Sequence, residues 1–200
     1  MPAIIKPELL KLSERLVGQQ CVLRPYRSGD GSAVFHAVDR SRADLKHWVT
    51  WVDEYPLEED WERYVRRMAA QWSTRESLVF GIWSSDETEL YGGVGIHGIN
   101  WTVPSGEVGY FLHADARGKG IAAEALRLVV ELGFHEIGMN RLWATCDVIN
   151  QGSWHLLDRV GFKREGHLRG ERRNPQGGIR DTFVYGMLAR EWQNTHSTSV

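Results

Sequence analysis

The chain has 200 residues, 42% of them hydrophobic, and a formal net charge of −2. This length suits one full core, so we expect a single domain over residues 1–200. The small net charge argues against a nucleic-acid or anionic-membrane partner. No apolar run approaches the roughly 20 residues that span a bilayer. The first residues lack the apolar stretch and cleavage site of a signal peptide, so we expect a cytoplasmic protein.

Residues 7–16 predict a charged amphipathic helix with its apolar side at Leu9, Leu10, Leu12 and Leu16. Further helices are predicted over residues 28–40, 58–72, 120–134 and 150–160. Strands are predicted over residues 21–25, 78–83, 91–100, 107–113, 141–146, 162–168 and 181–188. Residues 45–51 have the composition of an aromatic loop, and the polar tail 193–200 is expected to be disordered.

The order of these elements predicts the fold class. The strands between residues 78 and 113 follow one another as a meander, and strand–helix–strand units come after them. We therefore expect an α/β (α+β) fold, with a mixed central sheet and helices on both faces.

Metal binding is not expected. Cys21 and Cys146 both lie in apolar, strand-like runs, which is typical of buried reduced thiols. The eight histidines form no H-x-x-x-H pair, and no C-x-x-C pair is present.

The segment Arg117-Gly118-Lys119-Gly120-Ile121-Ala122 joins the strand 107–113 to the helix 120–134. Two glycines allow a tight turn and a close approach to a ligand. Free N–H groups at the helix start favour a phosphate, and Arg117 and Lys119 add positive charge. An ordinary basic turn between a strand and a helix is the alternative.

Residues 118–123 also fit the dinucleotide pattern G-x-G-x-x-A, and residues 93–98 contain a second match inside a strand. A dinucleotide fold normally begins with its glycine-rich loop and continues with several parallel strands. Here a meander precedes the loop and little chain follows it. A nicotinamide oxidoreductase is thus a minor alternative.

Several segments together resemble one family. The segment from Arg117 to Ala122 matches [Q/R]-x-x-G-x-[G/A], residues 150–153 match N-x-x-S, and residues 159–162 match [K/R]-x-G-F. Residues 45–51 are similar to L-x-x-W-x-x-W, and residues 107–112 and 165–169 add two weaker matches. The chain resembles the GNAT superfamily of N-acetyltransferases, in particular its RimJ/RimL-type ribosomal-protein acetyltransferases.

The resemblance implies that acetyl-CoA binds between two parting strands of a splayed sheet. By this match, the loop from Arg117 to Ala122 holds the pyrophosphate. The backbone of Phe111, Leu112 and His113 and the side chain of Asn150 hold the pantetheine arm, and Ser153 lies near the sulfur. Proteins of this type are often homodimers, so a homodimer is expected.

Direct attack by an amine requires a neutral amine, a donor for the thioester oxygen and an acid for the leaving thiolate. A backbone N–H of residues 111–113 would be the donor. Ser153 is the candidate acid, with capping of its own helix as the alternative. Glu171 and Glu107 are the candidate bases, and we expect Glu171 to matter more. Both are also plausible members of ion pairs.

Trp48, Trp51 and Asp53 are the candidate acceptor-binding residues, although tryptophans more often serve packing. His97 and His113 are candidate relay groups, with a structural role as the alternative. The expected acceptor is a primary amine, and the N-terminal α-amine of a ribosomal or other protein is one form of it. A small amine, an aminoacyl nucleotide or an antibiotic is a second option, and a non-catalytic acyl-CoA-binding module a third.

Overall fold

A computed structural model describes residues 6–49, 51–174 and 176–196 of the chain. Its centre is a mixed eight-stranded sheet with the strand order β1-β2-β3-β4-β5-β6-β8-β7. The strands are β1 (Leu16–Val17), β2 (Cys21–Pro25), β3 (Leu78–Ser84), β4 (Leu90–Asn100), β5 (Ser105–Leu112), β6 (Arg141–Asp147), β7 (Lys163–Arg173) and β8 (Ile179–Leu188).

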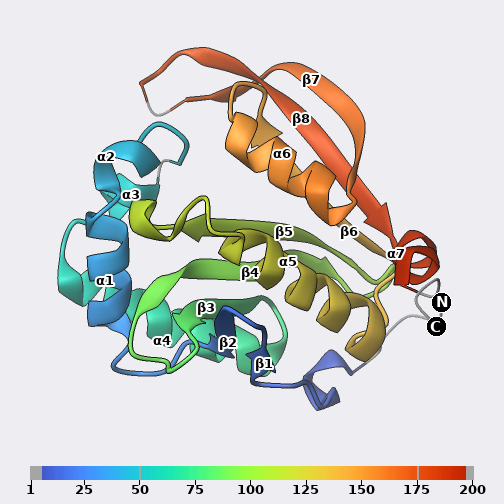
Figure 1. Cartoon of the computed structure of the whole chain (residues 1–200), viewed down its shortest axis with the longest axis horizontal. Helices are drawn as coiled ribbons and strands as arrows, with labels where there is room; N and C mark the ends of the chain where they lie inside the picture. The colour runs from blue at the N-terminus through green and yellow to red at the C-terminus, as the bar shows by residue number, and fades with distance from the viewer. Residues whose placement is uncertain (1–5, 50, 175, 197–200) are drawn as a thin grey trace.

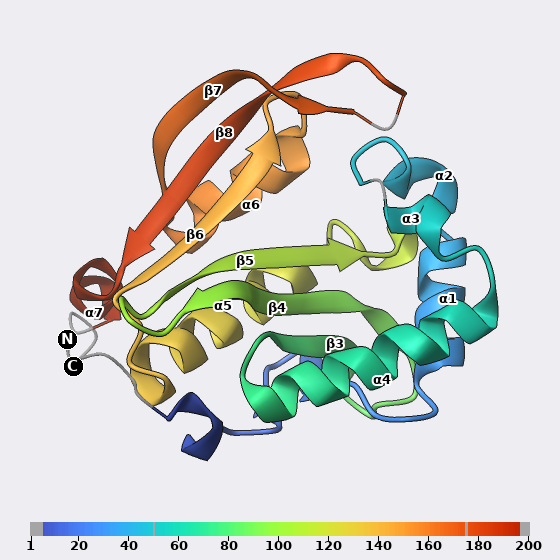
Figure 2. The same cartoon turned by 180° about the vertical axis from the view of Figure 1, so that it is seen from behind.

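Helices cover both faces of the sheet, as the sequence predicts. The long helix α4 lies against one face and α5 and α6 lie against the other, with α1, α2 and α3 at one end and α7 at the opposite end (Figure 1, Figure 2). The helices are α1 (Gly31–Asp39), α2 (Arg42–Leu45), α3 (Trp51–Glu54), α4 (Glu58–Thr74), α5 (Ile121–Glu131), α6 (Gln151–Val160) and α7 (Ala189–His196). None of the helices in the described residues is long and apolar enough to cross a membrane.

Helix α5 forms where the apolar residues recur every three to four positions. Ile121, Ala125, Leu126, Val129 and Val130 are buried on one side of it, and α5 contacts β2, β4 and β5. This face secures the start of α5 beside the end of β5, so the loop between them has a fixed position. A π-helical turn, Leu132–Glu136, continues the helix.

Strands β5 and β6 are parallel neighbours that stay paired over only part of their length. Ser105–Glu107 pair with Arg141–Trp143, and beyond these residues the two strands have no register partners in each other. Strand β5 remains paired with β4, and β6 remains paired with β8. The sheet therefore opens as a V between β5 and β6 (Figure 2).

Two predictions about the chain ends were wrong. In place of a helix over residues 7–16, only a 3-10 turn, Pro7–Leu9, precedes an extended segment. Leu10 and Leu12 pack against the core while Lys11 and Ser13 are exposed, an alternation typical of extended chain. Residues 193–196 of the predicted disordered tail belong to α7, which buries Trp192 against the core. Residues 197–200 lie outside the described part of the chain.

Residues 46–49 of the segment 45–51 form a turn and irregular chain, as expected for a loop, between two short helices, and residue 50 lies outside the described part of the chain. Leu45 ends the short helix α2 and Trp51 begins the short helix α3. The hydroxyl of Ser41 accepts a hydrogen bond from the Ala114 N–H at 2.6 Å, which attaches α2 to the segment after β5. Helices α2 and α3 lie at the wide end of the V (Figure 1).

Candidate active site

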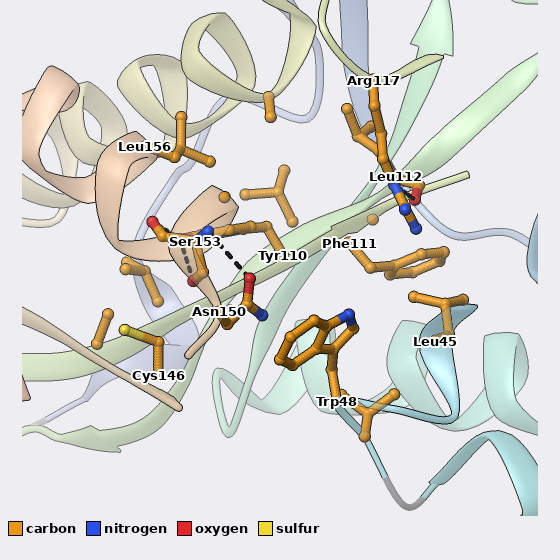
Figure 3. Close-up of a pocket in the computed structure, with 18 of the residues that line it drawn as sticks. Leu45, Trp48, Tyr110, Phe111, Leu112, Arg117, Cys146, Asn150, Ser153 and Leu156 are labelled. Carbon is orange, nitrogen blue, oxygen red and sulfur yellow. Dashed lines mark hydrogen bonds between the residues drawn. The ribbon is translucent and has the colours of Figure 1, made fainter. Parts of the chain in front are cut away.

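A cleft of about 1250 Å³ occupies the gap between β5 and β6. Its lining comes from both strands, from the starts of α5 and α6, from the α2–α3 region and from α4. Figure 3 shows side chains from β5, β6, α6 and the α2–α3 region around one space. The cleft runs from the loop that begins α5 to the aromatic residues near α2 and α3.

The loop before α5 has the geometry of a phosphate site. Gly118 and Gly120 have φ angles of +74° and +87°, in the left-handed region that favours glycine, and Gly120 is the N-cap of α5. The N–H groups of the first turn have no partners within the helix and carry the positive end of its dipole. Gly118, Gly120, Ile121 and Ala122 line the cleft, and Lys119 is exposed between the glycines. These residues fit a pyrophosphate.

Arg117 is placed by two contacts. Its Nε donates to the Leu112 carbonyl oxygen at 3.2 Å, and its Nη1 forms an ion pair with Asp44 on α2. The guanidinium therefore lies between the end of β5 and α2, at the border of the cleft (Figure 3). An arriving phosphate and Asp44 would compete for the same cation.

Fewer backbone N–H groups of residues 111–113 point into the gap between β5 and β6 than the resemblance implies. The His113 N–H donates to the Tyr91 carbonyl at 2.9 Å, toward β4. Because backbone groups alternate along an antiparallel ladder, those of Phe111 also face β4, and those of Tyr110 and Leu112 face the gap. Of residues 111–113, Leu112 alone presents its N–H to the cleft.

Ser153, Asn150 and Tyr110 meet where β5 and α6 face each other. Asn150 is the N-cap of α6, and its side chain accepts from the Ser153 N–H at 3.2 Å. The Ser153 hydroxyl lies 3.0 Å from the Tyr110 phenol oxygen, so Ser153 does not cap its own helix. Sequence reasoning missed Tyr110, because its phenol meets Ser153 only in the folded protein.

Burial determines the protonation state of Tyr110 and Cys146 in this part of the cleft. It raises the pKa of Tyr110 well above the ordinary value for a phenol, and the hydrogen bond from Ser153 offsets part of the effect. Burial also raises the pKa of Cys146, on the β6 wall, to about 11. Both groups thus keep their protons at neutral pH.

The two candidate carboxylates have different surroundings. Glu107 lines the cleft, and its Oε1 accepts from the Thr145 hydroxyl at 2.8 Å; the same hydroxyl accepts from Arg172 Nη2 at 3.2 Å. Glu171 accepts from the buried Thr182 hydroxyl at 2.7 Å and lies 3.6 Å from Arg172 Nε. Among the described residues that line the cleft, Arg172 is present and Glu171 is not.

The three predicted acceptor-binding residues do not all lie in the cleft. Trp48 and Trp51 both line the cleft. The Trp51 ring makes edge contacts with Phe111 and Trp61, at centroid distances of 5.6 and 5.8 Å. Figure 3 shows the Trp48 indole pointing into the cleft between Phe111 and Asn150. Asp53 forms a 2.7 Å ion pair with Lys46 and is largely exposed.

The two candidate relay histidines also separate. His97, on β4, lines the cleft, and its Nδ1 lies 2.9 Å from the Ser77 hydroxyl. His113 is buried beside Tyr91, with Glu89 at 3.7 Å, and is not among the described residues that line the cleft. Within residues 6–49, 51–174 and 176–196, no group of three His, Cys, Asp or Glu side chains has the arrangement of a metal site.

Comparison with known proteins agrees with this geometry. The family model "Acetyltransferase (GNAT) domain" matches residues 20–163. Probable N-acetyltransferase YjcK of Bacillus subtilis (strain 168) is 33% identical over 156 residues, which are 77% of this chain and 86% of the relative. The [ribosomal protein uS5]-alanine N-acetyltransferase of Escherichia coli (strain K12) is 24% identical over 182 residues, 89% of this chain and 92% of the relative.

A solved structure shows the same fold. RimL, a ribosomal L7/L12 alpha-N-protein acetyltransferase in complex with coenzyme A, superposes with a TM-score of 0.81 at 20% identity. The match covers 86% of this chain and 96% of RimL. With the family model matching more than half of the chain and a glycine-rich loop at the start of α5 that suits a pyrophosphate, the chain belongs to the GNAT family and is an acetyl-CoA-dependent N-acetyltransferase.

Proposed function

We propose that the acceptor is the N-terminal α-amine of a protein, and that ribosomal proteins are the first candidates. The observation that carries the proposal is one continuous cleft, which runs from the glycine-rich loop before α5 through the V to Glu107 and Trp48. A donor bound at one end and a chain terminus entering from the other would meet between β5 and β6. The uS5-alanine acetyltransferase and RimL names of related proteins point to the same acceptor class.

We assign acetyl-CoA to the half of the cleft next to α5 and α6. The first turn of α5, with Gly118 and Gly120, is suited to the pyrophosphate. The gap-facing backbone of Tyr110 and Leu112 is suited to the amides of the pantetheine arm, as a strand edge without a partner. The side chain of Asn150 lies along the same route (Figure 3).

Four residues are assigned to the transfer itself. The Leu112 N–H is the donor for the thioester oxygen as charge develops there. Ser153 passes a proton to the leaving sulfur, supported by Tyr110, whose phenol keeps its proton. Glu107 faces the acceptor end and attracts the amine. Glu107 lines the cleft, whereas Glu171 is not among its described lining residues. We therefore assign Glu107 the larger role in acetyl transfer, the reverse of the order expected from sequence.

A small amine is the second candidate acceptor, and one contact favours it. The side-chain amide of Gln176, at the tip of the β7–β8 hairpin, donates to the Lys46 carbonyl oxygen at 3.1 Å. The tip of the hairpin lies near α2 at the wide end of the V (Figure 1). It restricts the entrance to compact acceptors unless the hairpin moves.

A competitive acetylation screen tests the acceptor. Peptides carrying the N-termini of ribosomal proteins, the same peptides with blocked α-amines, and a panel of small amines would be incubated with acetyl-CoA. Mass spectrometry would then locate the added 42 Da. Acetylation of the free α-amine peptides alone supports the proposal, whereas turnover of small amines alone supports the second candidate.

We also propose a cytoplasmic homodimer, which follows from the resemblance to RimJ/RimL-type enzymes. Light scattering coupled to size exclusion measures the mass of the 22.8 kDa chain in solution. Twice that mass would support the dimer, and fractionation of cells that produce the protein would test its location.

A further inference from the structure

His97 occupies a position in the cleft that the assignments above do not use. It lies on β4 and is the register partner of Glu107 on β5, so the two side chains are cross-strand neighbours. Both line the acceptor half of the cleft. His97 is also next to Gly109: a Cβ added there would lie 3.6 Å from the imidazole Nε2. At this distance an added Cβ would make an ordinary van der Waals contact with the ring.

A short chain of hydrogen bonds sets the orientation of the imidazole. The buried Ser77 hydroxyl lies 3.3 Å from the Ile96 carbonyl oxygen, which can only accept, and 2.9 Å from His97 Nδ1. When the Ser77 hydroxyl donates to Ile96, Nδ1 must carry the proton and donate to Ser77. The lone pair is then on Nε2.

The ring has the properties that a base needs. Nε2 has no hydrogen-bond partner among the side chains and backbone of the described residues. Burial lowers the pKa of His97 below its ordinary value, which keeps the ring neutral at neutral pH. The charged side chains in the same half of the cleft are Glu107 from β5, Arg172 from β7 and Arg67 from α4, and the lowering of the pKa is due to burial.

We propose that His97 Nε2 is the general base that takes the proton of the acceptor amine, with Ser77 as the positioning residue that sets its tautomer. The ammonium form of the amine, which Glu107 attracts, gives one proton to Nε2. The freed nitrogen lone pair forms the C–N bond with the acetyl carbon as the C–S bond breaks, and the sulfur leaves with a proton from the Ser153–Tyr110 pair. The second proton lost by the nitrogen passes through water and restores that pair, and the proton on His97 passes to water. Glu107 does not remove a proton.

The proposal rests on the transferase function above, and its test uses whichever primary amine the wild-type protein acetylates. We expect His97→Gln to lower kcat by about 10²–10³-fold, because a positioned base contributes about that much. The dissociation constant for acetyl-CoA should stay within about twofold, since the phosphate loop is untouched. The matched control is His36→Gln, an exposed histidine on α1 that should keep the wild-type kcat.

The pH dependence of kcat separates a base from a structural histidine. In the wild type, kcat should fall on the acid side with the pKa of His97, and this limb should be absent in His97→Gln. Ser77→Ala removes the hydrogen-bond acceptor of Nδ1–H. That hydrogen bond stabilises the charged imidazolium more than the neutral ring, so its loss should lower the pKa of His97 and move the acid limb to lower pH. We also expect kcat to fall about tenfold.

Wild-type kcat and an unchanged acid limb in His97→Gln would overturn the proposal. If His97→Gln shows no cooperative unfolding transition, the test is made on Ser77→Ala. An acid limb displaced to lower pH supports His97 as the base, and an unchanged pH profile excludes this role. If the wild-type protein acetylates only small amines, the proposal of a protein N-terminus as acceptor is wrong. The role of His97 is still tested, because the histidine variants are then compared with the wild type on that small amine.

Discussion

The phenol oxygen of Tyr110 and the hydroxyl oxygen of Ser153 lie 3.0 Å apart and join β5 to α6 across the mouth of the V. The Tyr110 phenol is also 3.1 Å from the Ser153 carbonyl oxygen, to which it donates. The hydroxyl of Ser153 is thereby held at one place in the cleft. Since burial keeps the phenol protonated, the pair can supply a proton on the side of the leaving sulfur.

Removing either hydroxyl should slow turnover without preventing coenzyme binding. We expect Ser153→Ala and Tyr110→Phe each to lower kcat about 10²-fold, and the double variant to lose little more, because the two groups act as a unit. Steady-state kinetics and calorimetry with CoA would measure the two quantities. Additive losses would show that the hydroxyls act separately.

Positive charge at the phosphate loop should determine the affinity for acetyl-CoA. Arg117→Ala combined with Lys119→Ala should raise the dissociation constant at least about tenfold, since each lost charge-assisted hydrogen bond contributes about 1.5–3 kcal/mol. Isothermal titration calorimetry measures it directly. The control is Arg63→Ala with Arg66→Ala on the exposed side of α4, which removes the same charge away from the cleft. Equal weakening in both pairs would argue for a general charge effect.

Both thiols should be inert in the folded protein. Cys21 is buried next to Glu124, and burial followed by that carboxylate raises its pKa to about 12. Burial raises the pKa of Cys146 to about 11. Because the thiolate is the reactive form, a disulfide reagent at pH 8 should modify neither thiol within minutes, and both in guanidinium. Rapid labelling of one thiol under native conditions would contradict this, and peptide mapping would identify it.

The carboxylate of Glu62 should contribute a pH-dependent part of the stability. Arg66 and the Gly29 N–H, followed by the Gly31 N–H, hold the pKa of Glu62 at about 2. A depressed carboxylate pKa stabilises the fold above the unfolded value, and the effect is lost as pH falls. Glu62→Gln should therefore lower the Tm most at pH 7, and the difference from wild type should shrink from about pH 5 downward.

The control for this measurement is Glu59→Gln, an exposed glutamate on the same helix. It removes the same charge but none of the contacts at the start of α1. A Tm difference for Glu62→Gln that stays constant from pH 7 to pH 4 would show that the side chain acts through packing.

The fold followed from local signals because the relevant contacts are regular. The apolar period of α5 and the glycines before it are visible in sequence, and they determine the phosphate loop. The splay between β5 and β6 could be inferred only from the family resemblance. No residue in either strand signals that pairing stops after Glu107, since the cause is the separate pairing of β5 with β4 and of β6 with β8.

The errors came from tertiary contacts that sequence periods do not encode. Leu10 and Leu12 fit a helix by spacing, but in the folded protein both pack against the core from an extended segment. Thr145 and Arg172, the neighbours of Glu107, come from β6 and β7 and meet only in the folded protein. The environment of a candidate base therefore required the structure.

Trp48 and Trp51 should respond to substitution in opposite ways. Trp51 contacts Phe111 and Trp61 by its ring edges, so Trp51→Ala should remove packing and lower the free energy of unfolding by about 2–4 kcal/mol. The Trp48 ring has no aromatic partner within the described residues and points into the cleft (Figure 3). Trp48→Ala should leave the stability within about 1 kcal/mol and raise the KM of the acceptor about tenfold.

Urea unfolding and acceptor kinetics on the same preparations would measure both effects. Trp48→Phe is the conservative variant, because a smaller ring keeps an aromatic face at the acceptor end of the cleft and should recover most of the KM. If Trp48→Ala lost stability as Trp51→Ala does, with an unchanged KM, then Trp48 would be a packing residue. Trp48 and Trp51 would then both stabilise the fold, and recognition of the amine would fall to Glu107 and His97, which line the same cleft from β5 and β4.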